Sequence, residues 1–137
     1  MLCYCDSSAL LKLFVEEIGT RAMRQFLAGD VEMTSSVIAQ VEVLRGLARR
    51  GGEDDSKRAA AYLDSMTMLA LGESVLKRAA AMKPVALRSL DAIHLASALQ
   101  LSPPPDAFLS YDERLLEAAR AIGLPALSPG ADEVHEP

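Results

Sequence analysis

The sequence predicts an α/β fold in which helices cover a parallel sheet of four to five strands. Short β-rich runs alternate with segments of helical periodicity along the chain, which implies strands joined by right-handed crossovers. The first run, residues 3–5, stops on Asp6 and passes directly into a helical segment. With 137 residues, 50% of them hydrophobic, the chain is long enough for one domain with its own core.

The elements can be placed from their periodicity and their turn residues. Strands are expected where short apolar runs lie between turn residues, at 3–5, 31–34, 67–70, 106–110 and 124–127. Helices are expected where apolar residues recur every three or four positions, at 9–15, 20–28, 37–50, 56–65, 72–82, 90–101 and 112–122. The helix ends are marked by turn residues, among them Gly19, Gly29, Gly51, Pro84 and Gly123.

A run of three prolines at 103–105 breaks the chain between a helix and a strand. It is not a domain linker, because too little chain follows it to form another domain. We therefore expect one domain over residues 1–129 and a loose polar tail over 130–137.

The charge and the cysteines limit the class of protein. A net charge of −5 and an isoelectric point of about 5.0 argue against a broad basic surface for nucleic acid, so such a role must rely on a metal ion and a few arginines. A disulfide between Cys3 and Cys5 would be strained, so both are expected to be reduced core residues of a cytoplasmic protein. We expect neither a signal peptide nor a membrane span, because no apolar run reaches the ~20 residues that a span needs.

Four acids fall at the ends of predicted elements. Asp6 ends the first strand, Glu42 lies on the helix after the second, and Asp91 and Asp112 flank the fourth strand on the helix before it and at its exit. In an open parallel sheet such positions converge outside the carboxyl ends of the strands. Taken alone, Asp6 is better explained as a helix cap, so the prediction depends on the whole set.

Carboxylates gathered in this way need a counter-charge. Two of them ~4 Å apart repel by about 4 kcal/mol at an effective dielectric constant of 20. A divalent cation relieves this repulsion, and a ligand set of oxygen atoms alone suits Mg²⁺ or Mn²⁺ rather than zinc. Such a site activates water against a phosphate, which indicates phosphodiester hydrolysis.

Three motifs surround these acids. Asp6 begins Asp-Ser-Ser-Ala-Leu, Asp91 lies in Leu-Arg-Ser-Leu-Asp-Ala-Ile-His-Leu-Ala at 87–96, and Asp112 lies in Ser-Tyr-Asp-Glu-Arg-Leu at 110–115. With Glu42, these motifs resemble the PIN-domain ribonucleases and, among them, the VapC toxins of toxin–antitoxin pairs. The resemblance extends from the first strand to about Pro129, and the run at 87–96 is its most specific part.

The resemblance implies a PIN-like three-layer α/β/α fold and a Mg²⁺-dependent endoribonuclease, in which Mn²⁺ can substitute. It further implies an RNA substrate, a cognate antitoxin and a homodimer. The residues that match the family's four acids are Asp6, Glu42, Asp91 and Asp112.

Roles can be assigned to these acids and to their neighbours as hypotheses. Asp6 and Asp91 are expected to be the principal metal ligands, with Asp112 completing the shell directly or through water and Glu42 orienting water or a second ion. Of the neighbouring hydroxyls, Ser8 matches the residue that the family uses beside its first acid, and Ser110 stands where threonine is more usual.

Two other classes of protein are open alternatives. A receiver-type phosphoacceptor domain has similar length and architecture, and Lys83-Pro84 is similar to its lysine-proline step. Against it, the first strand ends on one acid rather than a pair, and the third strand ends in Ala70-Leu71-Gly72 without an aspartate. A non-catalytic interaction domain has no use for four separated acids on one rim.

Several basic residues near the acids allow two interpretations each. His94, one helical turn after Asp91, is either a hydrogen-bonded core residue or a neighbour of the site. Arg88 either holds a substrate phosphate or pairs with an acid when RNA is absent. Arg45 and Arg49 either contact RNA or supply positive charge to the end of their helix.

The resemblance to toxins suggests a mode of regulation. An arginine of a partner could pair with two carboxylates of the cleft and take the place of the metal charge. The rest of the partner is expected to be an amphipathic helix in a groove beside the first helices. Phe14 and Ile18 are the candidates for an exposed stripe there, whereas Leu10 and Leu13 are expected to face the core.

Overall fold

The computed structural model describes residues 1–50 and 52–131, which fold around one sheet of five parallel strands. The strands are β1 (Leu2–Cys5), β2 (Glu32–Ser36), β3 (Thr67–Leu69), β4 (Ala107–Leu109) and β5 (Ala126–Leu127). Their order in the sheet is β3-β2-β1-β4-β5, and every neighbouring pair is parallel. The predicted parallel sheet is confirmed.

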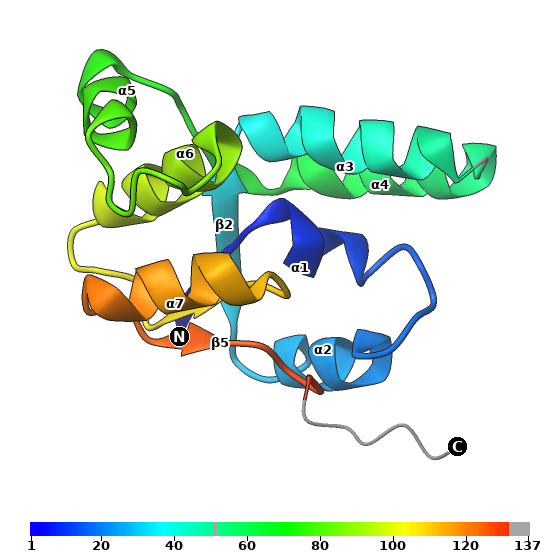
Figure 1. Cartoon of the computed structure of the whole chain (residues 1–137). Helices are drawn as coiled ribbons and strands as arrows, with labels where there is room; N and C mark the ends of the chain where they lie inside the picture. The colour runs from blue at the N-terminus through cyan, green and yellow to red at the C-terminus, as the bar shows by residue number, and fades with distance from the viewer. Residues whose placement is uncertain (51, 132–137) are drawn as a thin grey trace.

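Seven helices connect the strands within the described residues (Figure 1). They are α1 (Ser7–Leu11), α2 (Thr20–Leu27), α3 (Ile38–Arg49), α4 (Glu53–Ser65), α5 (Glu73–Ala80), α6 (Ser89–Leu99) and α7 (Glu113–Ala121). None of these helices is long and apolar enough to cross a membrane.

The alternation of side chains in β1 divides the core into two layers. Cys3 and Cys5 point to one face, where helices α1 to α4 pack, and both cysteines are buried and free of disulfides. Tyr4 points to the other face, where α6 and α7 pack. The fold is therefore the expected three-layer α/β/α arrangement.

The strand order determines where a ligand can bind. From β1 the chain proceeds outward to β2 and β3, and then crosses to β4 and β5 on the other side of β1. The topological switch therefore lies between β1 and β4, and the crevice outside their carboxyl ends is the expected site. Receiver domains have the order 2-1-3-4-5, so the order found here excludes that alternative.

The first helix is shorter than predicted. The sequence predicts a helix over 9–15, but α1 ends at Leu11 and the chain continues in tight turns, with the N–H of Phe14 bonded to the carbonyl of Leu11 at 3.0 Å. The turns bury Phe14 against Tyr62, with ring centroids 5.6 Å apart. Tertiary packing overrides the helical periodicity here, and the prediction of an exposed Phe14 is wrong.

Other predictions differ from the structure in smaller ways. Leu10 is buried and Ile18 is exposed, both as predicted. α4 begins at Glu53 rather than at residue 56, so the acidic residues 53–55 lie within its first turn. Negative charge there stabilises the helix through its interaction with the helix dipole. α6 covers Ser89–Leu99 rather than 90–101, and its first turn is not buried, since Leu90 is exposed. Of the predicted tail at 130–137, residues 132–137 lie outside the described part of the chain.

Candidate active site

Asp6 directly follows β1 and is buried in the crevice, with 3% of its surface exposed. Its Oδ1 accepts hydrogen bonds from Ser8 Oγ at 2.7 Å and from the N–H of Ala9 at 2.9 Å, so Asp6 also caps α1. Its Oδ2 accepts one from Ser110 Oγ at 2.6 Å. Burial raises the pKa of Asp6 above its ordinary value, and the influence of His94 and the three hydrogen bonds offset only part of that rise.

Glu42 lies on the second turn of α3 and is held from two sides. Its Oε1 accepts hydrogen bonds from Ser7 Oγ at 2.6 Å and from His94 Nε2 at 2.7 Å. Burial acts to raise the pKa of Glu42, but these two bonds outweigh it, so the pKa lies below its ordinary value. Glu42 is therefore ionised at neutral pH.

Asp91 lies in the first turn of α6, partly buried. Its pKa is raised to about 6, chiefly by burial and then by the negative charges of Asp112 and Asp6, with a smaller contribution from Glu42. A carboxyl whose ionisation is opposed by three other acids must share their electrostatic environment. The structure thus brings the four predicted acids into one region.

Asp112 follows β4 and caps α7. Its Oδ1 accepts hydrogen bonds from the N–H groups of Arg114 at 2.9 Å and Leu115 at 3.3 Å. The N–H of Asp112 donates to Ser110 Oγ at 3.0 Å, so the serine that binds Asp6 also fixes the start of α7. One carboxylate oxygen of Asp112 is thereby occupied, and Oδ2 is the one left for the crevice.

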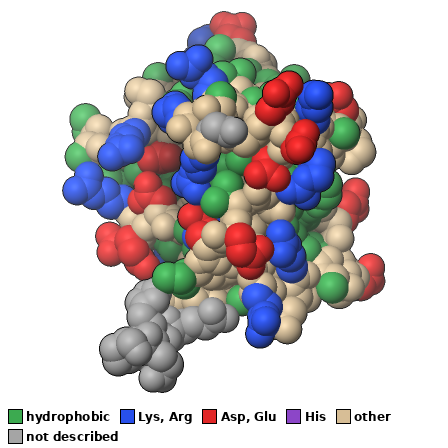
Figure 2. Space-filling view, turned by 90° about the vertical axis from the view of Figure 1, so that its right-hand side faces the viewer, with side chains coloured by type: hydrophobic (Ala, Val, Ile, Leu, Met, Phe, Trp, Pro, Cys, Tyr) green, Lys and Arg blue, Asp and Glu red, His purple; other side chains and the backbone are tan. Residues whose placement is uncertain are grey.

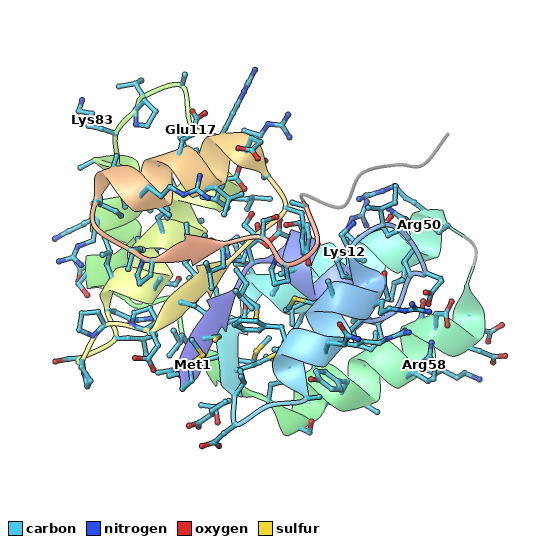
Figure 3. The ribbon with its side chains drawn as sticks, turned by 90° about the horizontal axis from the view of Figure 1, so that it is seen from below. Met1, Lys12, Arg50, Arg58, Lys83 and Glu117 are labelled. Carbon is cyan, nitrogen blue, oxygen red and sulfur yellow. The ribbon has the colours of Figure 1, made fainter. Side chains whose placement is uncertain are left out.

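A cavity of about 310 Å³ opens beside two of these acids, and its lining includes Arg88, Asp91, Asp112 and Arg114. Its walls are the loop before α6 and the start of α7. In Figure 3, Lys83 of that loop and Glu117 of α7 lie at the same edge of the molecule. The cavity therefore combines acids with two exposed arginines.

The two arginines differ in how well the sequence anticipates them. Arg88 is a predicted substrate residue, and it forms no ion pair with any acid of the described residues, so the alternative of pairing in the absence of RNA is not observed. Arg114 is not predicted, although it lies in the Ser-Tyr-Asp-Glu-Arg-Leu motif. Sequence analysis also misses Ser7 and Tyr4, which contact His94.

The donor set fits a hard divalent cation, because it consists of carboxylate and hydroxyl oxygens without a thiolate. Burial and then the negative charges of Asp112 and Asp6 raise the pKa of Asp91, and a bound cation would neutralise those charges. Within residues 1–50 and 52–131, however, no three His, Cys, Asp or Glu side chains stand close enough together to ligate one ion directly. Binding would therefore need side-chain rotation or water between the ion and some of the acids.

Comparisons with known proteins show which family the chain belongs to. The family model described as PIN domain matches residues 3–121. Ribonuclease VapC47 of Mycobacterium tuberculosis is 40% identical over 132 residues, which cover 93% of this chain and 97% of the relative. Ribonuclease VapC46 of the same species is 38% identical, covering 92% of this chain and 96% of the relative.

Solved structures share the fold at lower identity. VapC20 of Mycobacterium tuberculosis, described as a toxin that cleaves the sarcin-ricin loop, has a TM-score of 0.74 and 16% identity over 93% of this chain and 99% of that one. A toxin–antitoxin complex from Klebsiella pneumoniae has a TM-score of 0.66 and 20% identity over 93% and 97% of the two chains. From the family model and the curated relatives, the chain belongs to the PIN-domain family and, within it, to the VapC ribonucleases.

Proposed function

We propose that this chain is a metal-dependent endoribonuclease that hydrolyses RNA phosphodiester bonds, and that it is the toxin of a toxin–antitoxin pair. The observation that carries the proposal is the placement of the acids outside the carboxyl ends of β1 and β4, where Ser110 joins Asp6 to Asp112 and one cavity is lined by both Asp91 and Asp112. The relatives named VapC are ribonucleases, and the family depends on divalent metals. Mg²⁺ is the proposed metal, with Mn²⁺ as a substitute.

The four acids have separate roles in this proposal. Asp6 and Asp91 are the principal metal ligands, Asp112 contributes directly or through water, and Glu42 orients water or a second ion. The occupied Oδ1 of Asp112 favours contact through Oδ2 or through water. A divalent cation bound there would polarise the scissile phosphate and lower the pKa of a bound water.

The substrate is held by the protein's own cations. Arg88 and Arg114 line the cavity beside Asp91 and Asp112, and a guanidinium pairs well with phosphate oxygens. On the face shown in Figure 2, lysines and arginines are interspersed with acids and form no broad basic surface. RNA would therefore be bound locally, at the cavity, rather than along a basic face.

The proposed partners are an antitoxin and a second copy of this chain. An antitoxin arginine that enters the crevice would pair with the carboxylates and keep the metal out. The accompanying antitoxin helix is proposed to lie near the exposed Ile18, since Phe14 and Leu10 belong to the core.

RNA cleavage by the purified chain tests the proposed function. Single-stranded and hairpin RNAs should be cut with Mg²⁺ or Mn²⁺ and left intact with a chelator, and sequencing the new RNA ends identifies the target. Asp91→Asn should abolish cleavage, whereas Asp64→Asn, at an exposed acid of α4, should leave it unchanged. Failure of the wild-type chain to cut any RNA, or full activity of Asp91→Asn, would refute the proposal.

A further inference from the structure

His94 is a buried imidazole whose hydrogen bonds all reach outside its own helix. It lies on α6 with 1% of its surface exposed. Tyr4 Oη is 2.7 Å from Nδ1, Glu42 Oε1 is 2.7 Å from Nε2, and Ser7 Oγ is 3.2 Å from the same nitrogen. A polar ring is costly to bury unless it is hydrogen-bonded, so these contacts account for its place in the core.

The carboxylate of Glu42 fixes the direction of its bond with His94, and the direction of the Tyr4 bond follows for the neutral ring. The Tyr4 hydroxyl accepts a hydrogen bond from the N–H of Ser36 at 3.2 Å and still has its own proton to donate. The carboxylate of Glu42 accepts only, so Nε2 of His94 must carry the proton of their shared bond. In the neutral ring Nδ1 is then an acceptor, to which the Tyr4 hydroxyl donates, and each of the three side chains has a hydrogen-bond partner.

The same contacts immobilise Glu42. Its Oε1 accepts from both His94 and Ser7, while no hydrogen bond from the described residues reaches Oε2. The side chain is 25% exposed, and a glutamate with that freedom would otherwise sample several rotamers. Two donors on one oxygen select a single orientation and leave Oε2 as the unoccupied oxygen.

The far end of this series is anchored in the sheet. Tyr4 belongs to β1 and stacks on Phe108 of β4, with ring centroids 5.3 Å apart and planes 3° apart. Ser36 is the last residue of β2, and its N–H donates to the Tyr4 hydroxyl. A third strand therefore also holds Tyr4 in place. The position of His94 is therefore tied to β2, β1 and β4, the three central strands of the sheet.

We infer that His94 is a positioning residue that, held in place by Tyr4, fixes Glu42 so that Oε2 is available to the active-site crevice. The inference rests on the proposed ribonuclease function. It adds that Glu42 acts in a preset orientation maintained by hydrogen bonds from the sheet, and that His94 acts on the reaction chiefly through Glu42.

A double-mutant cycle tests this dependence. The kcat for RNA cleavage at saturating metal is measured for the wild type, His94→Leu, Glu42→Gln and the double variant. Partners of this kind typically change activity by 10–100-fold, so His94→Leu should lower kcat by about that factor, with little change in KM for RNA. In the Glu42→Gln background the same change should cost less than about twofold. An equal loss in both backgrounds would overturn the inference.

Three further variants separate positioning from packing. His94→Gln keeps an N–H near Nε2 and should recover most of the kcat that His94→Leu loses, and Tyr4→Phe should give an intermediate loss. Leu116→Ala is the packing control, because Leu116 is buried on α7 in the same core layer as Tyr4 and its side chain makes no hydrogen bond. If Leu116→Ala lowered kcat as much as His94→Leu, packing alone would explain the effect and the inference would be overturned.

A readout independent of activity is the nitrogen NMR spectrum of the His94 ring in the metal-free wild-type chain. The inference requires a proton on Nε2, and an unprotonated Nε2 would overturn it. The two claims remain distinguishable. If the wild-type chain carries a proton on Nε2 but cuts no RNA, the proposed function is refuted. If His94→Leu is folded, as judged by thermal unfolding, and cuts RNA as fast as the wild type, only the positioning role is refuted.

Discussion

Ser110 donates a hydrogen bond of 2.6 Å from its hydroxyl to Oδ2 of Asp6, 104 positions away in the sequence. The two residues follow β4 and β1, which are paired neighbours in the sheet. The same hydroxyl accepts a bond from the N–H of Asp112 at 3.0 Å. A single serine thus joins the first acid of the site to the backbone of the fourth.

Ser110→Ala should therefore reduce activity without unfolding the chain. The change removes a donor from a buried carboxylate, which raises the pKa of Asp6 further and loosens its orientation. We expect kcat for RNA cleavage to fall by about 10–100-fold. Ser56→Ala removes a hydroxyl that donates to the carbonyl of Gly52 at the start of α4 and contacts none of the four acids, so it should leave kcat unchanged. Equal activity of the two variants would refute this role of Ser110.

Asp91→Asn should stabilise the metal-free chain in a pH-dependent way. Because the pKa of Asp91 in the folded state is about 6, above its ordinary 3.8, the folded chain binds this proton more tightly than the unfolded chain does. Protonation of Asp91 stabilises the folded wild type fully below about pH 4, and this stabilisation is lost as the pH rises through 6. Above pH 7 the variant should exceed the wild type by about 1–3 kcal/mol in unfolding free energy.

Denaturant unfolding in the presence of a chelator measures this difference between pH 4 and pH 8. Asp64→Asn is the control, since Asp64 is exposed on α4, and its effect should not grow with pH. A wild type as stable as Asp91→Asn at pH 8 would show that the acids do not repel one another in the folded chain.

Arg114→Ala should weaken RNA binding more than the chemical step. Loss of one charge-assisted contact to phosphate should raise KM by about tenfold with a smaller effect on kcat. The slope of log KM against log salt should fall by about 0.7, the value for one contact to a single strand. Arg58→Ala is the control, because Figure 3 places Arg58 at the opposite end of the molecule from Lys83 and Glu117. Similar KM values for both variants would exclude Arg114 from the RNA site.

The predicted homodimer has a candidate face in the structure. Leu76 of α5 and Val85 in the following loop are 47% and 81% exposed, and both line one hollow of about 360 Å³. Exposed apolar side chains grouped in this way are typical of an interface. Light scattering at micromolar concentration should show a dimer, Val85→Glu should give a monomer, and Ile122→Glu, at an exposed site directly after α7, should remain dimeric. A monomeric wild type would contradict the prediction.

The sheet follows from the sequence almost completely, but its second strand shows a limit of pattern analysis. The apolar pattern ends β2 at residue 34, whereas β2 continues through Ser35 and Ser36. These polar residues are tolerated in a buried strand because Ser35 Oγ donates to the carbonyl of Cys5 at 2.6 Å and the N–H of Ser36 donates to Tyr4 Oη. Such long-range bonds leave no local signal in the sequence.

The acids of the site can be predicted from the sequence, whereas the residues that hold them in position cannot. Asp6 and Asp112 end strands and cap helices, so their place in the crevice follows from local sequence. The contact of His94 with Tyr4 joins residues 90 positions apart on different elements, and a tyrosine alternating with two cysteines in β1 indicates only a core position. Only the three-dimensional structure shows that the Tyr4 hydroxyl contacts His94, which in turn contacts Glu42.

The central claim is that Asp6, Asp91 and Asp112 bind a catalytic divalent cation, and Mn²⁺ located in crystals by anomalous scattering tests it most directly. The account predicts a strong peak between these three carboxylates that disappears in Asp91→Asn. A peak found only elsewhere, for example beside the exposed acids Glu53 and Asp54, or no peak at a Mn²⁺ concentration that supports RNA cleavage, would contradict the claim.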